Sequence, residues 1–264
     1  MITLLALGLV TCATLTLLYG RLLGPLIGPA IEATSRLHPA ATALWLRLIA
    51  VAPLALGLIT SLLVVAVGSG ALGHPHHCVA HEDAHLHLCL LHTPELGFRG
   101  WLLLMLPLAW LVGQAGRAAR RRLRAHRLTR TLLLNASPDP RGFVVPETEA
   151  PLAMTVGVLR PTILISLGLS RTLSDAELGV VLAHERAHVS RRDLIWHKAV
   201  VTAICAWPAP VHTPLRRAHT LACERACDEA AAEEIGGRLR VAQVLLRIAR
   251  LIEFCPSHIA ALGP

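Results

Sequence analysis

Two histidines and a glutamate stand in one short stretch of the chain, His184-Glu185-Arg186-Ala187-His188. On a helix, side chains four residues apart point the same way, one turn above the other, so both imidazoles can grip one metal ion. This spacing is typical of sites in which two histidines bind Zn²⁺ and the intervening glutamate acts as a base on water. We therefore expect His184 and His188 to bind Zn²⁺ and Glu185 to be the catalytic base.

The residues before this motif predict the helix that it needs. Ser174 and Glu177 have the spacing of a capping box, in which each side chain satisfies a backbone N–H of the first turn. Leu178, Val181 and Leu182 follow at helical spacing. The alternative is an exposed helix whose histidines and glutamate merely face solvent. A capped helix around the motif favours the metal site.

A third ligand is needed, because catalytic zinc sites use three protein ligands and keep one position open. A metzincin would place a histidine at the sixth residue beyond His188, but Leu194 stands there. A thermolysin-like spacing would place a carboxylate about twenty residues beyond, where Trp207 and Pro208 stand. The third ligand must therefore come from further along the chain.

Two carboxylates four residues apart, Glu224 and Asp228, are the best candidates on the helix expected over 216–235. Glu224 would complete the metal site, and Asp228 would bond the free ring nitrogen of a ligand histidine. His219, Cys223 and Cys227 form a rival stripe at the same spacing. Buried free cysteines are commonly just small apolar residues, so we favour Glu224.

Apolar residues make up 54% of the chain, the mean hydropathy is +0.56, and the hydrophobicity is unevenly placed. Apolar runs at about 1–20, 44–67 and 100–116, of which only the second contains a charge, Arg47, are near the length that spans a hydrocarbon core of about 30 Å. The first run has no basic segment before it and Arg21 directly after it, which argues against a cleavable signal peptide. We expect three transmembrane helices.

The formal net charge of +8 comes almost wholly from arginine. An arginine-rich segment at 117–130 follows the third run and favours the cytoplasmic side. Alternation then places the N-terminus and residues 71–99 outside and the histidine motif inside. Because the arginines adjoin apolar runs, we interpret them as topology signals and contacts to membrane lipids, and we expect no direct nucleic-acid binding.

The outer loop, 71–99, is rich in histidine. His77, His81 and His85 would share a helix face, and clustered imidazoles bind Zn²⁺ or Cu²⁺. We favour the plainer interpretation of a solvated polar loop, because composition alone defines no coordination geometry. A metal-sensing or pH-sensing loop is the alternative hypothesis.

The segment 131–240 is expected to be the zinc metallopeptidase domain, and 241–264 an amphipathic C-terminal tail. A strand over 153–159, a turn at Arg160-Pro161 and a return strand over 162–165 predict a hairpin. Thr155, Val156, Gly157 and Val158 would then offer an edge to an extended substrate. Equally, the hairpin could serve only to pack the core.

Together these motifs resemble the BlaR/MecR family of membrane metallopeptidases. The matching stretches are Arg160-Pro161-Thr162-Ile163-Leu164-Ile165, Leu173-Ser174-Asp175-Ala176-Glu177-Leu178, the histidine motif with Arg192-Asp193, and Glu224-Arg225-Ala226-Cys227-Asp228. The resemblance covers roughly 141–235. It implies that His184, His188 and Glu224 bind zinc, that Glu185 is the base, and that Asp228 supports a ligand. The active site is also similar to those of HtpX-like and prenyl-protein (CAAX) proteases.

The expected fold is a mainly α membrane protein, with three transmembrane helices and a cytoplasmic, minigluzincin-like α+β protease domain carrying a small β-hairpin or sheet. The resemblance implies signalling by cleavage of a cytoplasmic protein such as a winged-helix transcriptional repressor. No penicillin-binding sensor domain or Ser-x-x-Lys motif follows the protease region, so we do not expect β-lactam sensing. The alternatives are an HtpX-like quality-control protease and a non-proteolytic metal-binding receptor that uses the outer loop.

Overall fold

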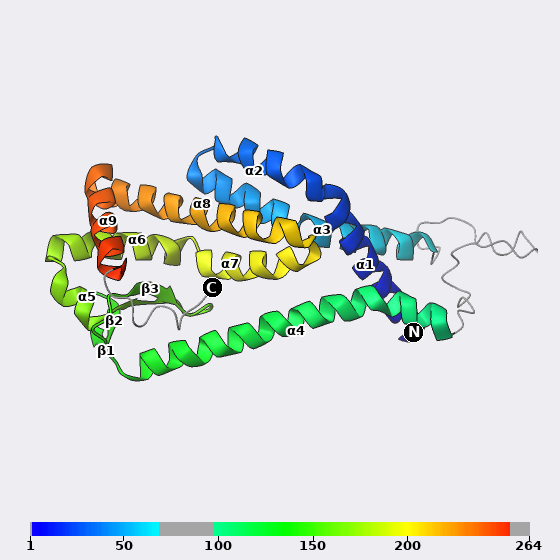
Figure 1. Ribbon diagram of the computed structural model, residues 1–264, viewed down its shortest axis with the longest axis horizontal. Coiled ribbons are helices and arrows are strands. Elements are labelled where there is room, and N and C mark those ends of the chain that lie inside the picture. Colours follow the sequence, from blue (N-terminus) through cyan, green and yellow to red (C-terminus); the bar gives the residue numbers. More distant parts are fainter. Residues whose placement is uncertain (1, 69–97, 254–264) are drawn as a thin grey trace, which may run out of the picture.

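The computed structural model describes residues 2–68 and 98–253, and it is mostly helical (Figure 1). The outer-loop candidates His77, His81 and His85 lie outside the described residues. The helices are α1 (Ile2–Leu23), α2 (Ile27–Ser35), α3 (Pro39–Gly68), α4 (Phe98–Leu134), α5 (Leu167–Thr172), α6 (Asp175–Ser190), α7 (Asp193–Ala203), α8 (Ala209–Ile235) and α9 (Arg238–Glu253). The strands are β1 (Ala136–Asp139), β2 (Phe143–Pro146), β3 (Ala153–Val156) and β4 (Thr162–Ile165).

Two stretches of the described chain are long and apolar enough to cross a membrane, Gly8–Ser35 and Pro39–Ala66. On α3, Leu58, Ile59 and Leu62 are each more than half exposed, as expected of a surface that faces lipid rather than water. The third predicted run, 100–116, lies in α4, which continues unbroken through the arginine-rich segment to Leu134. The helix is therefore longer than the predicted run, and the third span stays a prediction.

Helices α1 and α3, which lie in the two candidate spans, approach closely at Gly57. A side chain at Gly57 of α3 would collide with the backbone of Thr16 in α1, since its Cβ would lie 2.8 Å from the Thr16 nitrogen. Ser61 of α3 also donates to the Gly8 carbonyl of α1 at 3.1 Å. Close backbone approach at a small residue is the usual way in which apolar helices associate without a hydrophobic driving force between them.

The four strands form one sheet in the order β1-β2-β4-β3. Strands β1 and β2 pair antiparallel, as do β3 and β4, while β2 and β4 pair parallel. The predicted hairpin is thus confirmed, and β3 is an edge strand. Strand β3 ends at Val156, however, so Gly157 and Val158 lie in the turn and not in the strand as predicted. Gly157 has φ +87°, a left-handed conformation that turns the chain away from the extended path.

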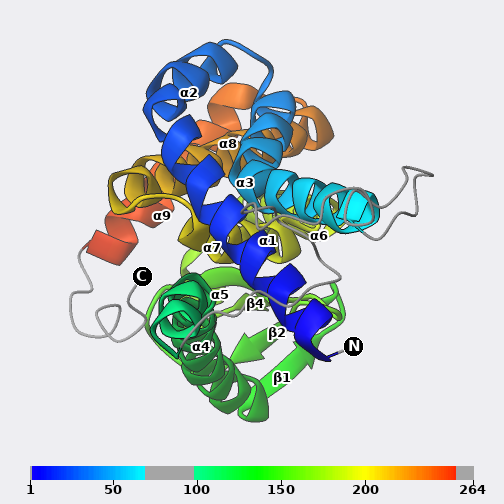
Figure 2. The ribbon, with the colours of Figure 1, turned by 90° about the vertical axis from the view of Figure 1, so that its right-hand side faces the viewer.

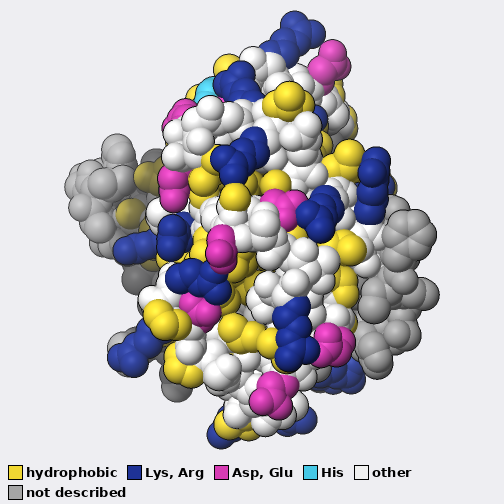
Figure 3. All heavy atoms as spheres, turned by 90° about the vertical axis from the view of Figure 1, so that its left-hand side faces the viewer, with side chains coloured by type: hydrophobic (Ala, Val, Ile, Leu, Met, Phe, Trp, Pro, Cys, Tyr) yellow, Lys and Arg dark blue, Asp and Glu magenta, His cyan; other side chains and the backbone are white. Residues whose placement is uncertain are grey.

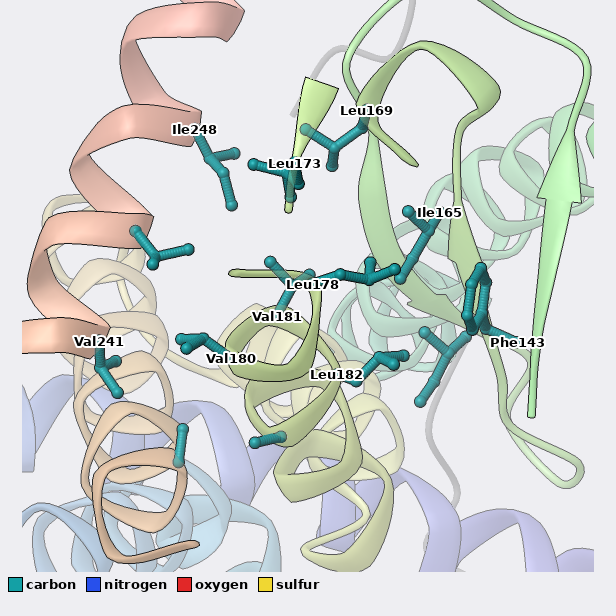
Figure 4. Close-up of a cluster of buried hydrophobic side chains, with 14 of the residues drawn as sticks. Phe143, Ile165, Leu169, Leu173, Leu178, Val180, Val181, Leu182, Val241 and Ile248 are labelled. Carbon is teal, nitrogen blue, oxygen red and sulfur yellow. The ribbon is translucent and has the colours of Figure 1, made fainter. Parts of the chain in front are cut away.

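The core of the sheet-bearing part is built around α6, whose apolar side chains pack against the sheet, α5, α8 and α9 (Figure 4). Phe143 and Ile165 contact it from the sheet, Leu169 from α5, and Val241 and Ile248 from α9. The segment beyond 240, expected to be a separate tail, therefore contributes buried side chains to the same core. The histidine motif sits on the helix that this core surrounds.

A second cluster of buried side chains joins the candidate spans to α7 and α8. Leu46 and Ala50 of α3 pack against Val200 of α7 and Leu215 of α8. The indole of Trp207 donates to the Ala50 carbonyl at 3.0 Å. Figures 1 and 2 both show α3 alongside α8. The helices that carry the site are thus packed directly on a candidate membrane helix.

The end of the molecule formed by α5, α6 and α9 has a different surface (Figure 3). Arginine and carboxylate side chains are interspersed there among apolar ones, as in the pairs Arg247–Glu177 and Arg141–Asp175. Such a mixed, charged surface suits water. The polar end and the apolar α3 surface together give the molecule two chemically distinct regions.

We predict that Ser174→Ala weakens the site helix. The Ser174 hydroxyl accepts from the Glu177 N–H and the Glu177 carboxylate accepts from the Ser174 N–H, so the capping box of α6 is formed as predicted. Its loss should lower the free energy of unfolding by about 0.5–2 kcal/mol. Ser190→Ala, at the other end of α6, is the control, because its hydroxyl caps no N–H. Equal stability of the two variants in chemical denaturation would contradict the prediction.

Candidate metal centre

Helices α6 and α8 cross so that three ligand atoms meet. Nε2 of His184 and Nε2 of His188 are 3.2 Å apart, and Oε2 of Glu224 lies 3.4 Å from the first and 3.7 Å from the second. Two ligands at about 2.1 Å from a tetrahedral metal would stand about 3.4 Å apart. The three atoms therefore have the separations of a site that grips one divalent ion.

The other ring nitrogen of His184 faces Asp228, as the sequence predicted for a supporting carboxylate. Nδ1 of His184 lies 3.0 Å from Oδ1 of Asp228. The contact is at hydrogen-bond distance but poorly aligned, and both atoms are buried with no other partner among the described residues. Asp228 thus supplies a carboxylate oxygen at hydrogen-bond distance from this ring nitrogen.

His188 has a carboxylate of its own, Asp193, which the sequence argument quoted only as part of the family resemblance. Oδ2 of Asp193 lies 3.2 Å from Nδ1 of His188. Asp193 can turn back to the histidine because Arg192, between α6 and α7, adopts a left-handed conformation with φ 53°. A non-glycine residue in this conformation is uncommon, and such strain is often found beside functional sites. Periodicity along α6 does not predict this contact, because Asp193 lies beyond the end of that helix.

These carboxylates govern the charge of the two imidazoles. Burial opposes protonation of His184, but Asp228 and Glu224 outweigh it and raise its pKa to about 9. Burial likewise opposes protonation of His188, but Asp193, Cys227 and Glu224 raise its pKa to about 12. The two histidines in turn lower the pKa of Glu224 to about 2. The site thus concentrates negative charge around two imidazoles, which is the electrostatic setting that a divalent cation needs.

Glu185 lies between the metal-binding histidines along α6 and is held from the sheet. The Thr155 hydroxyl of β3 donates to Oε2 of Glu185 at 2.7 Å. The carboxylate is buried, and its orientation is set by this bond. Thr155 was singled out as part of a substrate edge, and nothing in its sequence context predicted that its side chain would bind the expected base.

The side chains of the metal cluster and of Glu185 line one cavity of about 420 Å³. Its polar wall includes His184, His188 and Glu224, and its apolar wall is contributed by Met154 of β3 and by Leu245 and Ile248 of α9, among others. An apolar wall beside a few placed polar groups is the usual form of a small binding site. The contribution from α9 was not expected, since that segment was treated as a tail.

The rival stripe on α8, His219, Cys223 and Cys227, does not form a metal-binding group of its own in the part of the chain that the structure describes. His219 and Cys223 contact Arg47 instead, and Cys227 lies against Asp193 and His188. Desolvation by burial lowers the pKa of His219 to about 4, so it is held neutral. Glu224 is close to both histidines, whereas Cys227 reaches only His188, where it forms a second possible metal-binding group with Asp193.

We predict that metal affinity rises with pH. A metal binds neutral imidazoles, so it must displace the protons that the carboxylates hold on His184, with a pKa of about 9, and on His188, with a pKa of about 12. Below pH 9 the apparent association constant should rise roughly tenfold per pH unit for each proton displaced. Competition with a chelator at several pH values measures this, once the chelator's own protonation is corrected for. An affinity that stays flat between about pH 6 and pH 8 would contradict the assigned charges.

Comparison with known proteins agrees with this geometry. The family described as BlaR1 peptidase M56 matches residues 103–251, more than half of the chain, and this range contains every residue of the metal cluster. No curated protein and no solved structure matches the chain significantly. The chain belongs to the BlaR1 peptidase M56 family, whose members are membrane-associated metallopeptidases.

Proposed function

We propose that the chain is a membrane-anchored zinc endopeptidase whose active site faces the cytoplasm. The observation that carries the proposal is the meeting of His184, His188 and Glu224 at ligand distance, with the Glu185 carboxylate held beside them by Thr155. Two imidazoles and one carboxylate form a ligand set used by zinc peptidases, in which the fourth position stays open. Imidazole-rich sites of this kind suit zinc better than Mg²⁺ or Ca²⁺, which prefer oxygen ligands.

The proposed chemistry is peptide hydrolysis. When bound, zinc supplies a Lewis acid that polarises the scissile carbonyl and lowers the pKa of a water molecule. Glu185 accepts the proton of the attacking water on its carboxylate and passes it to the leaving amine. Thr155 keeps the Glu185 carboxylate turned toward the cavity during both transfers. Asp228 and Asp193 hold the imidazoles of His184 and His188 in the tautomers that leave each Nε2 free.

A protein substrate fits the surroundings of this site. Strand β3 lies at the edge of the sheet, so its outer backbone groups are free to pair with an extended peptide. Within the predicted substrate edge, this role falls to Thr155 and Val156. The apolar wall of the cavity, with Leu245 and Ile248, suits an apolar side chain next to the cleaved bond.

Topology supports a cytoplasmic substrate. The arginine-rich segment of α4 favours the inner side of the membrane, and we propose that the apolar start of α4 forms a third span. The site, which packs on α3 through α7 and α8, would then face the cytoplasm. A cytoplasmic transcriptional repressor is the proposed class of substrate, and its cleavage would make the protein a signalling peptidase.

We predict that Glu185→Gln retains zinc but cleaves protein substrates at least about 100-fold more slowly, because the amide cannot accept the proton. Zinc content and proteolysis by the purified full chain are the two measurements. Glu177→Gln is a matched control, since that carboxylate caps α6 and lies outside the metal cluster. Unchanged proteolysis by Glu185→Gln would refute the assignment of the base.

Substrate breadth distinguishes the candidate functions. Cells that carry the parent chain, compared with cells that carry Glu185→Gln, should differ in one or two cleaved proteins if the protein signals. Many cleaved membrane proteins would favour a quality-control protease instead. If deletion of residues 73–92 abolishes function while Glu185→Gln leaves it intact, the protein is a non-proteolytic receptor.

We predict that Thr155→Val lowers kcat by roughly tenfold, because Glu185 loses the bond that orients it. KM and zinc content should stay near the parent values, because valine preserves the backbone of β3. Thr172→Val, which removes a hydroxyl of α5 bonded only to a backbone carbonyl, is the control. Steady-state kinetics on a peptide substrate measure kcat and KM of both variants. A change confined to KM would show that Thr155 contacts substrate rather than orienting the base.

A further inference from the structure

An arginine is buried in the second candidate membrane span, at the point where α3 meets the site. The Arg47 side chain is 9% exposed, although charged side chains inside such segments are costly unless they face the protein interior and are paired. The guanidinium turns inward, toward the helices that carry the site. Its Nη2 donates to Oδ1 of Asp193 at 2.5 Å. The side chain also lies 5.2 Å from the ring centroid of Trp196.

The same guanidinium reaches α8. Its Nε donates to Nε2 of His219 at 3.5 Å, and its Nη2 lies 3.7 Å from Sγ of Cys223. Arg47 is therefore the common partner of side chains on α7 and α8, the two helices that pack on α3. Because a guanidinium presents several donors in a rigid plane, it can hold three partners in fixed relative positions.

Asp193 passes this constraint to a metal-binding histidine. Its Oδ1 accepts from Arg47 while its Oδ2 faces Nδ1 of His188, so each carboxylate oxygen has a different role. The opposite ring nitrogen of His188, Nε2, is the one that meets His184 and Glu224. A continuous chain of contacts thus runs from α3 through α7 to the metal cluster.

A second arginine, Arg191, competes with His188 for the Asp193 carboxylate. The Arg191 Nε lies 3.2 Å from Oδ2 of Asp193, the oxygen that His188 needs. With Arg47 on Oδ1, the carboxylate is held so that Oδ2 serves His188 as well as Arg191. Without Arg47, Asp193, whose side chain is 6% exposed, keeps Arg191 as its one arginine partner among the described residues. A bidentate pair with Arg191 would take the carboxylate away from His188.

The two supporting carboxylates differ in just this respect. Asp228, which supports His184, has a side chain that is 41% exposed and has no ion pair with an arginine among the described residues. Water can solvate the rest of that carboxylate. Asp193 is buried and requires counter-charges, of which Arg191 supplies one and Arg47, on the candidate membrane helix α3, supplies the other.

We propose that Arg47 is a positioning residue of the metal centre, which acts through Asp193 to orient His188, so that the peptidase site is complete only with α3 in place. The proposal rests on the proposed zinc-binding function. Its measure is metal affinity, which does not depend on cleavage of any substrate.

The test uses the full chain in detergent and zinc affinity from competition with a chromogenic chelator. Arg47→Met should weaken zinc binding roughly 10- to 100-fold, the usual cost of losing a group that orients a ligand. Arg47→Lys should recover part of the loss, because an ammonium can face Asp193 but cannot hold all three partners. Arg36→Met, whose parent side chain is 78% exposed and pairs with Glu32, is the control and should bind like the parent.

Double variants establish the route of the effect. If Arg47 acts through Asp193, Arg47→Met/Asp193→Asn should bind zinc no more weakly than Asp193→Asn alone. With Asp228→Asn, which acts on the other histidine, the losses should instead multiply. Arg47→Met/Asp193→Asn removes both charges of this buried pair together, so it reports on the route even if Arg47→Met alone folds poorly, and the folding of Asp193→Asn, which leaves Arg47 without its carboxylate, is checked alongside it.

The possible results distinguish a failure of the role proposed for Arg47 from a failure of the proposed zinc-binding function. Parent-like affinity in a folded Arg47→Met chain, or losses that multiply with Asp193→Asn, would overturn the role of Arg47. A parent chain that takes up no zinc would overturn the proposed function itself. Weak binding by Arg47→Met, partial recovery by Arg47→Lys and no added loss with Asp193→Asn would establish the role.

Discussion

The attraction between two imidazoles and the carboxylates around them is the interaction on which the rest of the site depends. His184 and His188 project from one face of α6, and Glu224 comes to them from α8. Each histidine then has its own supporting acid, Asp228 or Asp193. Such a concentration of negative charge is stable in a largely buried place only while a cation, whether protons or a metal ion, lies at its centre. The packing of α6 against α8 and the charge of the site therefore constrain each other.

The surroundings divide the remaining tasks among separate elements. The sheet presents β3 and, through the Thr155 hydroxyl, binds the carboxylate of Glu185, the proposed base. The last helix, α9, closes the core around α6 and adds the apolar wall of the cavity. Helix α3 adds a buried cation from a candidate membrane span. Buried contacts of Leu46, Arg47 and Ala50 therefore join a candidate membrane span directly to the helices that carry the site.

Contacts at short sequence separation were predictable from the chain alone. The capping box at Ser174 and the pair His184 and His188 follow from helical geometry, which repeats regardless of what surrounds the helix. The β3–β4 hairpin likewise follows from two β-rich runs with a turn between them. The placement of Glu224 and Asp228 on one face of a helix was predictable for the same reason. The family match over 103–251 agrees with the family resemblance of these motifs.

Contacts between distant segments were decided only by the tertiary structure. Three features depend on contacts with distant residues, which local sequence patterns do not predict. They are the extent of α4, the left-handed turn at Arg192 and the inward orientation of the Arg47 side chain. Spacing along the chain could place Glu224 on the correct helix, but only the crossing of α6 and α8 turned it, rather than His219 and Cys223, toward the metal cluster. Periodicity describes one helix at a time, whereas the rotation of one helix against another is set by the side chains that fill the space between them.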